Sequence, residues 1–176
     1  MKEQEQQTRF EEIIMPHLDA AYNLARWLTR NEHDAEDIVQ DAFLRAFKFF
    51  ESFRGGNSRS WLLSIVRNTA YTWLEKNRRH EVGTISDEAI ENIQDGAPNP
   101  EALLLQHTGH QEIMDAIAEL PVEFREAIIL RELEEMSYKE IADVMNVPLG
   151  TVMSRLARAR RQLQDSLRHR QPGVSV

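Results

Sequence analysis

The stretch that most constrains the fold of this chain is residues 137–161, SYKEIADVMNVPLGTVMSRLARARR, which predicts two short helices around a tight turn. Ser137 is placed to cap the first helix, and Glu140 three residues later can close a capping box. Asn146 tolerates the left-handed backbone of a sharp turn, and Pro148 ends the first helix because it lacks a backbone donor. Two helices joined in this way predict a helix-turn-helix, an arrangement that contacts DNA.

The second helix of this pair has an apolar face and a cationic face. Its apolar residues recur at intervals of three and four, which predicts that they pack inward; they are Val152, Leu156, Ala159 and Leu163. Arginine forks and a small hydroxyl on the other face suit contacts with base edges and phosphates. The candidate DNA-contacting residues are Thr151, Met153, Ser154, Arg155 and Arg158. The alternative is a solvated basic helix at the end of an ordinary bundle, which would not need the capped turn.

Charge is unevenly distributed along the chain. The formal net charge is −8, which by itself argues against binding to nucleic acid. However, residues 52–80 and residues 148–176 each carry a net charge of +5, whereas residues 81–147 carry −13. Because screening limits the reach of each basic patch to about 10 Å, DNA would meet the two patches locally while the acidic remainder weakens nonspecific binding. We therefore expect a partner that holds the chain on DNA.

Composition limits the class of protein. A chain of 176 residues, 41% of them hydrophobic, can form one or two small domains. The sequence contains no cysteine, which excludes disulfides, iron–sulfur clusters and a thiol nucleophile. No segment approaches the ~20 apolar residues of a membrane span, and the first residues lack the apolar core of a signal peptide, so we expect a cytoplasmic protein without membrane insertion. Alternating strand patterns are absent, which predicts an all-α fold.

The first helices of the chain predict a compact bundle. Apolar spacing indicates one helix from Phe10 to near Asn31, with Pro16 as a kink or a late start, and a second helix that begins after Asp34. The apolar residues of the second helix cover more than one face. Either this helix packs on two sides as a central helix, or part of its surface docks another protein. The residues beside that surface are Asp37, Gln40, Asp41, Leu44 and Arg45.

A loop at residues 53–59 precedes a third helix, for which Ser60 is the expected cap. In this helix aromatic residues are interleaved with Asn68 and with basic residues. Bases of single-stranded DNA can stack on exposed rings while cations follow the backbone. For Trp61, packing in the core is favoured over a base contact. The third helix is therefore a candidate single-strand surface.

Residues 81–100 change in character and predict an acidic, flexible linker. From composition, solubility explains this acidity more simply than imitation of a nucleic-acid backbone. The helical pattern resumes at Pro100, and Pro121 stands in the first turn of a further helix, where its missing donor costs nothing. With the helix-turn-helix, these helices would form a four-helix domain over residues 101–170, followed by a disordered tail over residues 171–176.

A metal site is the enzyme-like alternative. His107 and His110 are three residues apart, and Glu101 or Glu112 could complete a set of ligands. Such spacing is common by chance, and no nucleophile, glycine-rich phosphate loop or convergent carboxylate pair accompanies it. We therefore expect no metal, no cofactor and no enzymatic activity.

Three stretches together resemble sigma factors of the extracytoplasmic-function group within the sigma-70 family. They are DAEDIVQDAFLRAFKFFESFRG, SWLLSIVRNTAYTWLEKNRR and LPVEFREAIILRELEEMSYKEIADVMNVPLGTVMSRLARAR, in the family's order. The resemblance implies a region 2-like domain over residues 1–80 that binds core RNA polymerase and the minus-10 element, and a region 4-like domain over residues 101–170 that binds the minus-35 element of promoter DNA. It also implies promoter-specific initiation of transcription and an anti-sigma factor as a further partner.

The resemblance also implies roles for individual residues. In the family, the surface that here holds Asp37, Gln40, Asp41, Leu44 and Arg45 binds a coiled coil of core polymerase. The minus-10 set would be Asn57 and Ser58, as the pocket for an extruded base, with Trp61, Asn68 and Thr72. The minus-35 set would be Thr151, Met153, Ser154, Arg155 and Arg158.

Two positions depart from the family's pattern, and one alternative to the family's role stays open. Thr72 stands where Asn or Asp is common, so the minus-10 base preference stays open, and Met153 stands where relatives often have a basic residue.

In the family the linker runs through the polymerase, which favours a functional role for its acidity. The competing interpretation is a conventional helix-turn-helix regulator, which would bind its promoter tightly without polymerase.

Overall fold

The computed structural model describes residues 2–81 and 109–170. Every regular element in these two ranges is a helix, which confirms the predicted all-α fold. The first range contains α1 (Lys2–Ile14), η1 (Met15–His17), α2 (Leu18–Thr29), α3 (Glu32–Lys48), η2 (Phe50–Ser52) and α4 (Ser58–Glu81). The second contains α7 (Gly109–Ala118), α8 (Val122–Ile128), the π-helical turn η3 (Ile129–Leu133), α9 (Tyr138–Met145) and α10 (Leu149–His169).

Several sequence predictions fall on other parts of the chain. The linker beyond Glu81, the helix start at Pro100, His107 and the tail over residues 171–176 lie outside the described residues. The exact domain boundaries therefore stay predictions. Among the described helices, none is both long enough and apolar enough to cross a bilayer.

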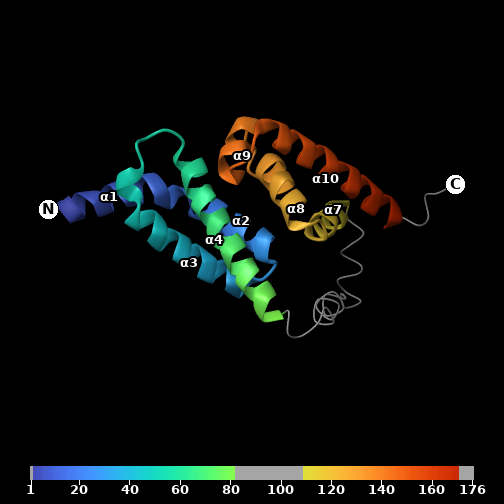
Figure 1. The fold of residues 1–176 in the computed structure, drawn as a ribbon, viewed down its shortest axis with the longest axis horizontal. Coiled ribbons are helices and arrows are strands. Elements are labelled where there is room, and N and C mark those ends of the chain that lie inside the picture. Colours follow the sequence, from blue (N-terminus) through green and yellow to red (C-terminus); the bar gives the residue numbers. More distant parts are fainter. Residues whose placement is uncertain (1, 82–108, 171–176) are drawn as a thin grey trace.

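The first domain is a bundle in which α2, α3 and α4 pack against one another (Figure 1). Pro16 lies in the short turn η1, which divides the predicted first helix into α1 and α2. Helix α2 ends where Arg30 adopts a left-handed φ of 61°. Asn31 then begins α3 by accepting a hydrogen bond from the backbone N–H of Asp34 at 3.0 Å. Helix α3 therefore begins before Asp34, earlier than predicted.

Ser60 is not the cap of α4, contrary to the sequence prediction. The helix begins at Ser58, and Asn57 Oδ1 accepts a hydrogen bond from the backbone N–H of Ser60 at 3.0 Å. Ser60 Oγ is buried and has no hydrogen-bond partner within residues 2–81 and 109–170. Asparagine and serine are both good caps, so residue type could not decide between the two positions. The backbone decides, because Gly55 and Gly56 both turn the chain at φ 89° just before Asn57.

We expect Asn57→Ala to lower the free energy of unfolding by about 0.5–2 kcal/mol, as other lost N-caps do. Ser60→Ala should change it by less than about 0.5 kcal/mol, because no hydrogen bond of its hydroxyl is lost. Urea unfolding followed by circular dichroism gives both values. A larger loss for Ser60→Ala would show that Ser60 is the cap after all.

The second domain contains the predicted four helices, with the helix-turn-helix formed by α9 and α10. Ser137 and Glu140 form the predicted capping box, in which each side chain accepts from the other residue's backbone N–H at 3.1 Å. Asn146 ends α9 with the expected left-handed φ, 55°. Pro148 immediately precedes α10. The predicted inward positions of α10 are buried or packed on the core; they are Val152, Leu156, Ala159 and Leu163.

The two domains lie against each other. Helix α2 packs on α8, and α4 packs on α9 (Figure 1). Buried side chains of both domains belong to one continuous apolar cluster. The described parts of the chain therefore form a closed arrangement of two domains.

Candidate nucleic-acid interface

The outer face of α3 carries the predicted docking residues. All five are exposed, namely Asp37, Gln40, Asp41, Leu44 and Arg45. Leu44 is 71% exposed, and Asp41 pairs with Arg45 at 3.4 Å one turn further along. The residues of the opposite face are buried: Ala35, Ile38, Ala42 and Ala46. Of the two interpretations of α3, this arrangement favours a docking surface, because a large apolar side chain stays in water beside charged ones.

Asn68 and Thr72 lie one turn apart and are exposed on α4. Thr72 Oγ1 donates to the backbone carbonyl of Asn68 at 2.9 Å. Asn68 Oδ1 accepts a long hydrogen bond of 3.5 Å from Arg67 Nη1. Both side chains can therefore be reached by an approaching strand.

Trp61 packs in an aromatic group at the start of α4. Its ring centroid lies 5.2 Å from that of Phe53 and 6.3 Å from that of Phe50. The side chain is half-buried and packs against the apolar cluster. This geometry agrees with the core interpretation, and it anchors the two ends of the loop at residues 53–59 to each other.

The two predicted base-pocket residues already have protein partners in this structure. Asn57 Nδ2 donates to Glu140 Oε2 at 2.6 Å, across to the second domain. Ser58 Oγ shares a hydrogen bond of 2.9 Å with His17 Nε2. Burial, and after it the charge of Arg59, lowers the pKa of His17, which favours the neutral imidazole in this pair.

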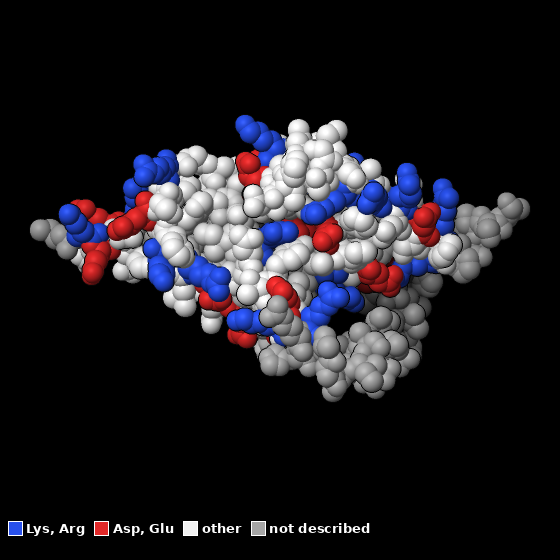
Figure 2. All heavy atoms as spheres, in the orientation of Figure 1, with Lys and Arg blue, Asp and Glu red and all other residues white. Residues whose placement is uncertain are grey.

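Helix α10 contains five arginines and a single aspartate. Blue side chains gather over the part of the surface where α10 lies (Figure 2). Met153, Ser154 and Arg158 are exposed, and Thr151 is half-buried at the start of the helix. Arg155 differs, because it is half-buried and its Nη1 is buried without a hydrogen-bond partner in the described ranges. Burial raises the pKa of Glu126 on α8, and the positive charge of Arg155 is one of the effects that oppose this rise. Met153, Ser154 and Arg158 of the predicted minus-35 set therefore face solvent, whereas Arg155 lies near Glu126.

Sequence reasoning missed a buried polar group between the domains. Glu126 is fully buried, and its Oε1 accepts from Arg67 Nε of the first domain at 2.8 Å. Its Oε2 accepts from the hydroxyl of Tyr71, also on α4. Burial raises the pKa of Glu126 despite the opposing effect of Arg67. The only available signal was a glutamate within the apolar run of α8, which resembles an ordinary exposed position.

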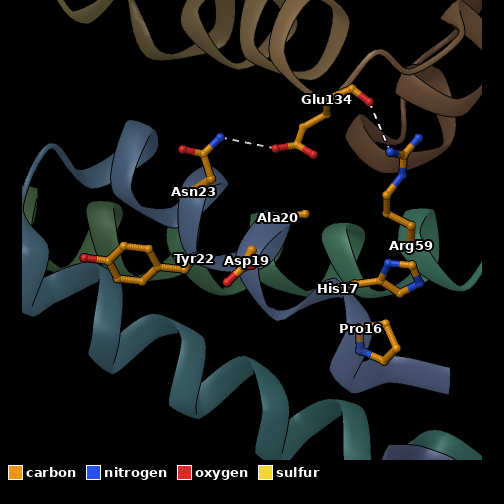
Figure 3. A pocket seen from close by; sticks show the side chains of 8 residues that line it. All are labelled: Pro16, His17, Asp19, Ala20, Tyr22, Asn23, Arg59 and Glu134. Carbon is orange, nitrogen blue, oxygen red and sulfur yellow. Dashed lines mark hydrogen bonds between the residues drawn. The ribbon is translucent and has the colours of Figure 1, made fainter. Parts of the chain in front are cut away.

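A second group of contacts joins the domains at an open pocket (Figure 3). Asn23 Nδ2 donates to Glu134 Oε1 at 3.2 Å, and Arg59 Nη1 donates to the backbone carbonyl of Glu134 at 3.1 Å. Arg59 Nη2 also lies 3.6 Å from Glu140 Oε2. The pocket is lined by Pro16, His17, Asp19, Ala20, Tyr22, Asn23, Arg59 and Glu134.

Arg125 of α8 makes a third connection. Its Nη2 donates to the carbonyl of Leu28 at the end of α2 at 3.0 Å, and its Nη1 donates to Ala118 and Leu120 at 3.2 and 3.0 Å. Burial lowers the pKa of Arg125 to about 10. The guanidinium thus satisfies carbonyl groups of both domains.

The hypothetical metal pair is only partly described. His110 is exposed near the start of α7, whereas His107 lies outside the described residues. Within residues 2–81 and 109–170, no three side chains of the usual ligand types come together.

Comparison with known proteins matches both domains. Residues 13–80 match sigma-70 region 2, and residues 110–163 match sigma-70 region 4. An ECF RNA polymerase sigma-E factor of Haemophilus influenzae is 38% identical over 151 residues, which cover 82% of this chain and 79% of that protein. The sigma-E factor of Escherichia coli is 38% identical over 141 residues, or 76% and 74%. The sigma factor SigE of Mycolicibacterium smegmatis is 34% identical over 158 residues, which cover 90% of this chain but only 61% of that protein.

Two solved structures have a similar fold. The sigma factor RpoE of Bartonella quintana, crystallised with the anti-sigma factor NepR, has a TM-score of 0.71 at 30% identity, covering 91% of this chain and 97% of that one. CnrH, in complex with the cytosolic domain of CnrY, has a TM-score of 0.63 at 24% identity, covering 93% and 90%, and supports the fold alone. With matches in both domains and in the same order, this chain belongs to the extracytoplasmic-function (ECF) sigma factors of the sigma-70 family.

Proposed function

We propose that this chain binds core RNA polymerase and directs it to promoters, where it starts transcription at defined sites. The observation that carries the proposal is the presence in one chain of both sigma-70 regions, each with an exposed surface suited to its role. Members of this family act by binding, so we infer that the chain is not itself an enzyme and needs no cofactor. Its action would be cytoplasmic, where its proposed partners are found.

The α3 surface, consisting of Asp37, Gln40, Asp41, Leu44 and Arg45, would dock on core polymerase. Leu44 projects into solvent between polar and charged neighbours. An apolar centre with a polar rim is the usual composition of a protein interface. The similarity to RpoE, which was crystallised with NepR, supports an anti-sigma factor as a further partner of this chain.

Promoter opening would be driven by binding energy. Separating a base pair from its neighbours costs roughly 1.4 kcal/mol per step, so the protein must bind the unpaired strand better than the duplex. A base captured by Asn57 and Ser58, and strand contacts with Trp61, Asn68 and Thr72, would supply this difference. The minus-35 duplex would be read by Thr151, Met153, Ser154, Arg155 and Arg158.

In vitro transcription tests the proposal directly. Purified chain, core polymerase and genomic DNA fragments are combined, and the RNA start sites are mapped. We expect start sites that require both proteins and that share sequence motifs upstream. If every start site were unchanged when the chain is omitted, the proposed function would be wrong.

We expect Leu44→Ala to weaken binding to core polymerase by about tenfold, as for an interface residue whose truncation costs more than 1 kcal/mol. The matched control is Leu18→Ala, because Leu18 is 39% exposed in the same domain but lies on α2. Competition against labelled wild-type chain measures both affinities. Equal affinities for Leu44→Ala and wild type would remove α3 from the docking surface.

A further inference from the structure

The closed arrangement cannot be the promoter-bound one. Elements centred near −35 and −10 are separated by about 25 base pairs, or about 85 Å of duplex at 3.4 Å per pair. Helices α4 and α10 both pack on α9. Since packed helices lie 8–10 Å apart, the two proposed reading helices are within about 20 Å of each other. They cannot read both elements of one straight promoter without moving apart.

We propose that the free chain holds itself closed through carboxylates of the second domain. These carboxylates bind side chains with which the first domain would contact DNA, so promoter binding requires the domains to part. This inference rests on the proposed function of the two domains. It adds an autoinhibitory contact within the chain, carried mainly by Glu140 and Glu126.

Glu140 occupies the proposed base pocket. Its Oε2 accepts from Asn57 Nδ2 at 2.6 Å and lies 3.6 Å from Arg59 Nη2. A carboxylate offers these donors the same kind of charged acceptor that a phosphate does. Its Oε1 stays in the capping box of α9 with Ser137. One side chain thus fixes the start of the helix-turn-helix and covers donors of the first domain.

Glu126 binds Arg67, a cation beside the proposed strand-reading residues. Arg67 precedes Asn68 on α4, where a cation could follow the backbone of a bound strand. In the closed form its guanidinium is bonded to Glu126 and lies over the ring of Tyr71, 4.1 Å from the centroid. Burial raises the pKa of Glu126, whereas the charge of Glu126 raises the pKa of Arg67 despite burial. Both charged groups are taken out of water in the closed form and would regain it when the domains part. The ion pair of Arg67 and Glu126 therefore helps to fix the closed geometry, and it can break when the domains part.

The sequence supports both closure and opening. Residues 52–80, which include most of α4, carry a net charge of +5, whereas residues 109–147, which include α9, carry −7. Since α4 packs on α9, the two segments that meet across the interface have opposite net charges. The connection between α4 and α7 is residues 82–108, and a chain of that length can span at most about 90 Å. The covalent connection is therefore long enough for the separation that a promoter demands.

The test locks the closed form in the full chain, which contains no cysteine. Asn23 and Glu134 meet at 3.2 Å across the interface (Figure 3) and belong to neither proposed binding surface. Both are replaced by cysteine and joined by a short bismaleimide whose spacer is cleaved by a reductant. The matched control joins cysteines at Glu132 and Arg160, which are 3.3 Å apart within the second domain.

We expect the interdomain pair to cross-link in the free chain in a yield similar to the control pair. The locked chain should lose at least about tenfold of its promoter-dependent RNA synthesis with core polymerase, and cleavage of the spacer should restore it. A locked chain that is as active as the cleaved one would overturn the proposal, as would poor cross-linking of the interdomain pair alone. Failure of the proposed function is distinct: the uncross-linked chain would start no RNA, while the cross-linking yield would still report closure.

A second variant tests the contribution of Glu140. Glu140→Gln keeps an acceptor for the capping box but loses the charge that faces Arg59. We expect interdomain cross-linking to slow by at least about twofold. Glu132→Gln removes the same charge from an exposed pair inside the second domain and should leave the rate unchanged. Equal rates in the two variants would exclude Glu140 from the closing contact.

Discussion

Leu156→Ala is expected to lower the free energy of unfolding by about 2–5 kcal/mol. Leu156 is 1% exposed, on the face of α10 that also buries Val152 and Ala159. Removing its methyl groups would leave a cavity, since a packed core relaxes only partly around lost atoms. Because domains of this size are stable by about 5–15 kcal/mol, the helix-turn-helix would then be close to unfolding at physiological temperature.

The matched control for this prediction is Met153→Ala on the same helix. Met153 is 52% exposed, so its truncation should change the free energy of unfolding by no more than about 0.5 kcal/mol. Urea denaturation of the two variants measures the difference. If both lost the same free energy, the division of α10 into an inward and an outward face would be wrong.

Arg158→Ala is expected to reduce promoter-specific transcription by roughly 5–150-fold, the equivalent of about 1–3 kcal/mol for a lost base contact. Arg158 is exposed on α10, away from the buried residues. Affinity for core polymerase should be unchanged, because the α3 surface lies in the other domain. Transcription from a promoter identified with the wild-type chain measures the first quantity, and competition for core polymerase measures the second.

Arg168→Ala controls for the loss of positive charge from the same helix. Arg168 is exposed ten residues further along α10, about 15 Å away at 1.5 Å per residue. It should affect transcription far less than Arg158→Ala. A template with a scrambled minus-35 element provides the second comparison. Equal losses for Arg158→Ala on the native and scrambled templates would contradict a role in minus-35 recognition.

The local features of the helix-turn-helix could be predicted from sequence. The capping box of Ser137 and Glu140 and the left-handed Asn146 both appear in the structure as expected. Such features depend on residues within a few positions of each other, so side-chain chemistry decides them. The buried face of α10 follows for a similar reason, since its period matches the helix.

Other local predictions failed where two residues could play the same part. Asn57 and Ser60 are both capping residues, and the turn through Gly55 and Gly56 selects Asn57. Asn31 likewise begins α3 before the acidic residues on which the prediction relied. In each case the backbone path ahead of the helix decides, and that path is set by packing beyond the segment itself.

The contacts between the domains could not be predicted at all. Arg67 and Glu126 are 59 positions apart, and Asn57 and Glu140 are 83 apart. Nothing in the spacing of either glutamate distinguishes it from a solvated residue on a helix. The roles of Asn57, Ser58 and Arg155 in DNA binding stay predictions, and the structure adds that their side chains face protein partners or the neighbourhood of Glu126.

The apolar cluster that runs through both domains makes closure sensitive to temperature. Parting the domains must bring apolar groups into contact with water, and this hydration carries a positive heat-capacity change. The free energy of closure must therefore curve with temperature, and its hydrophobic part must weaken on cooling. Temperature would thus act directly on the fraction of molecules that are free to engage DNA, whatever the concentration of any inhibitor.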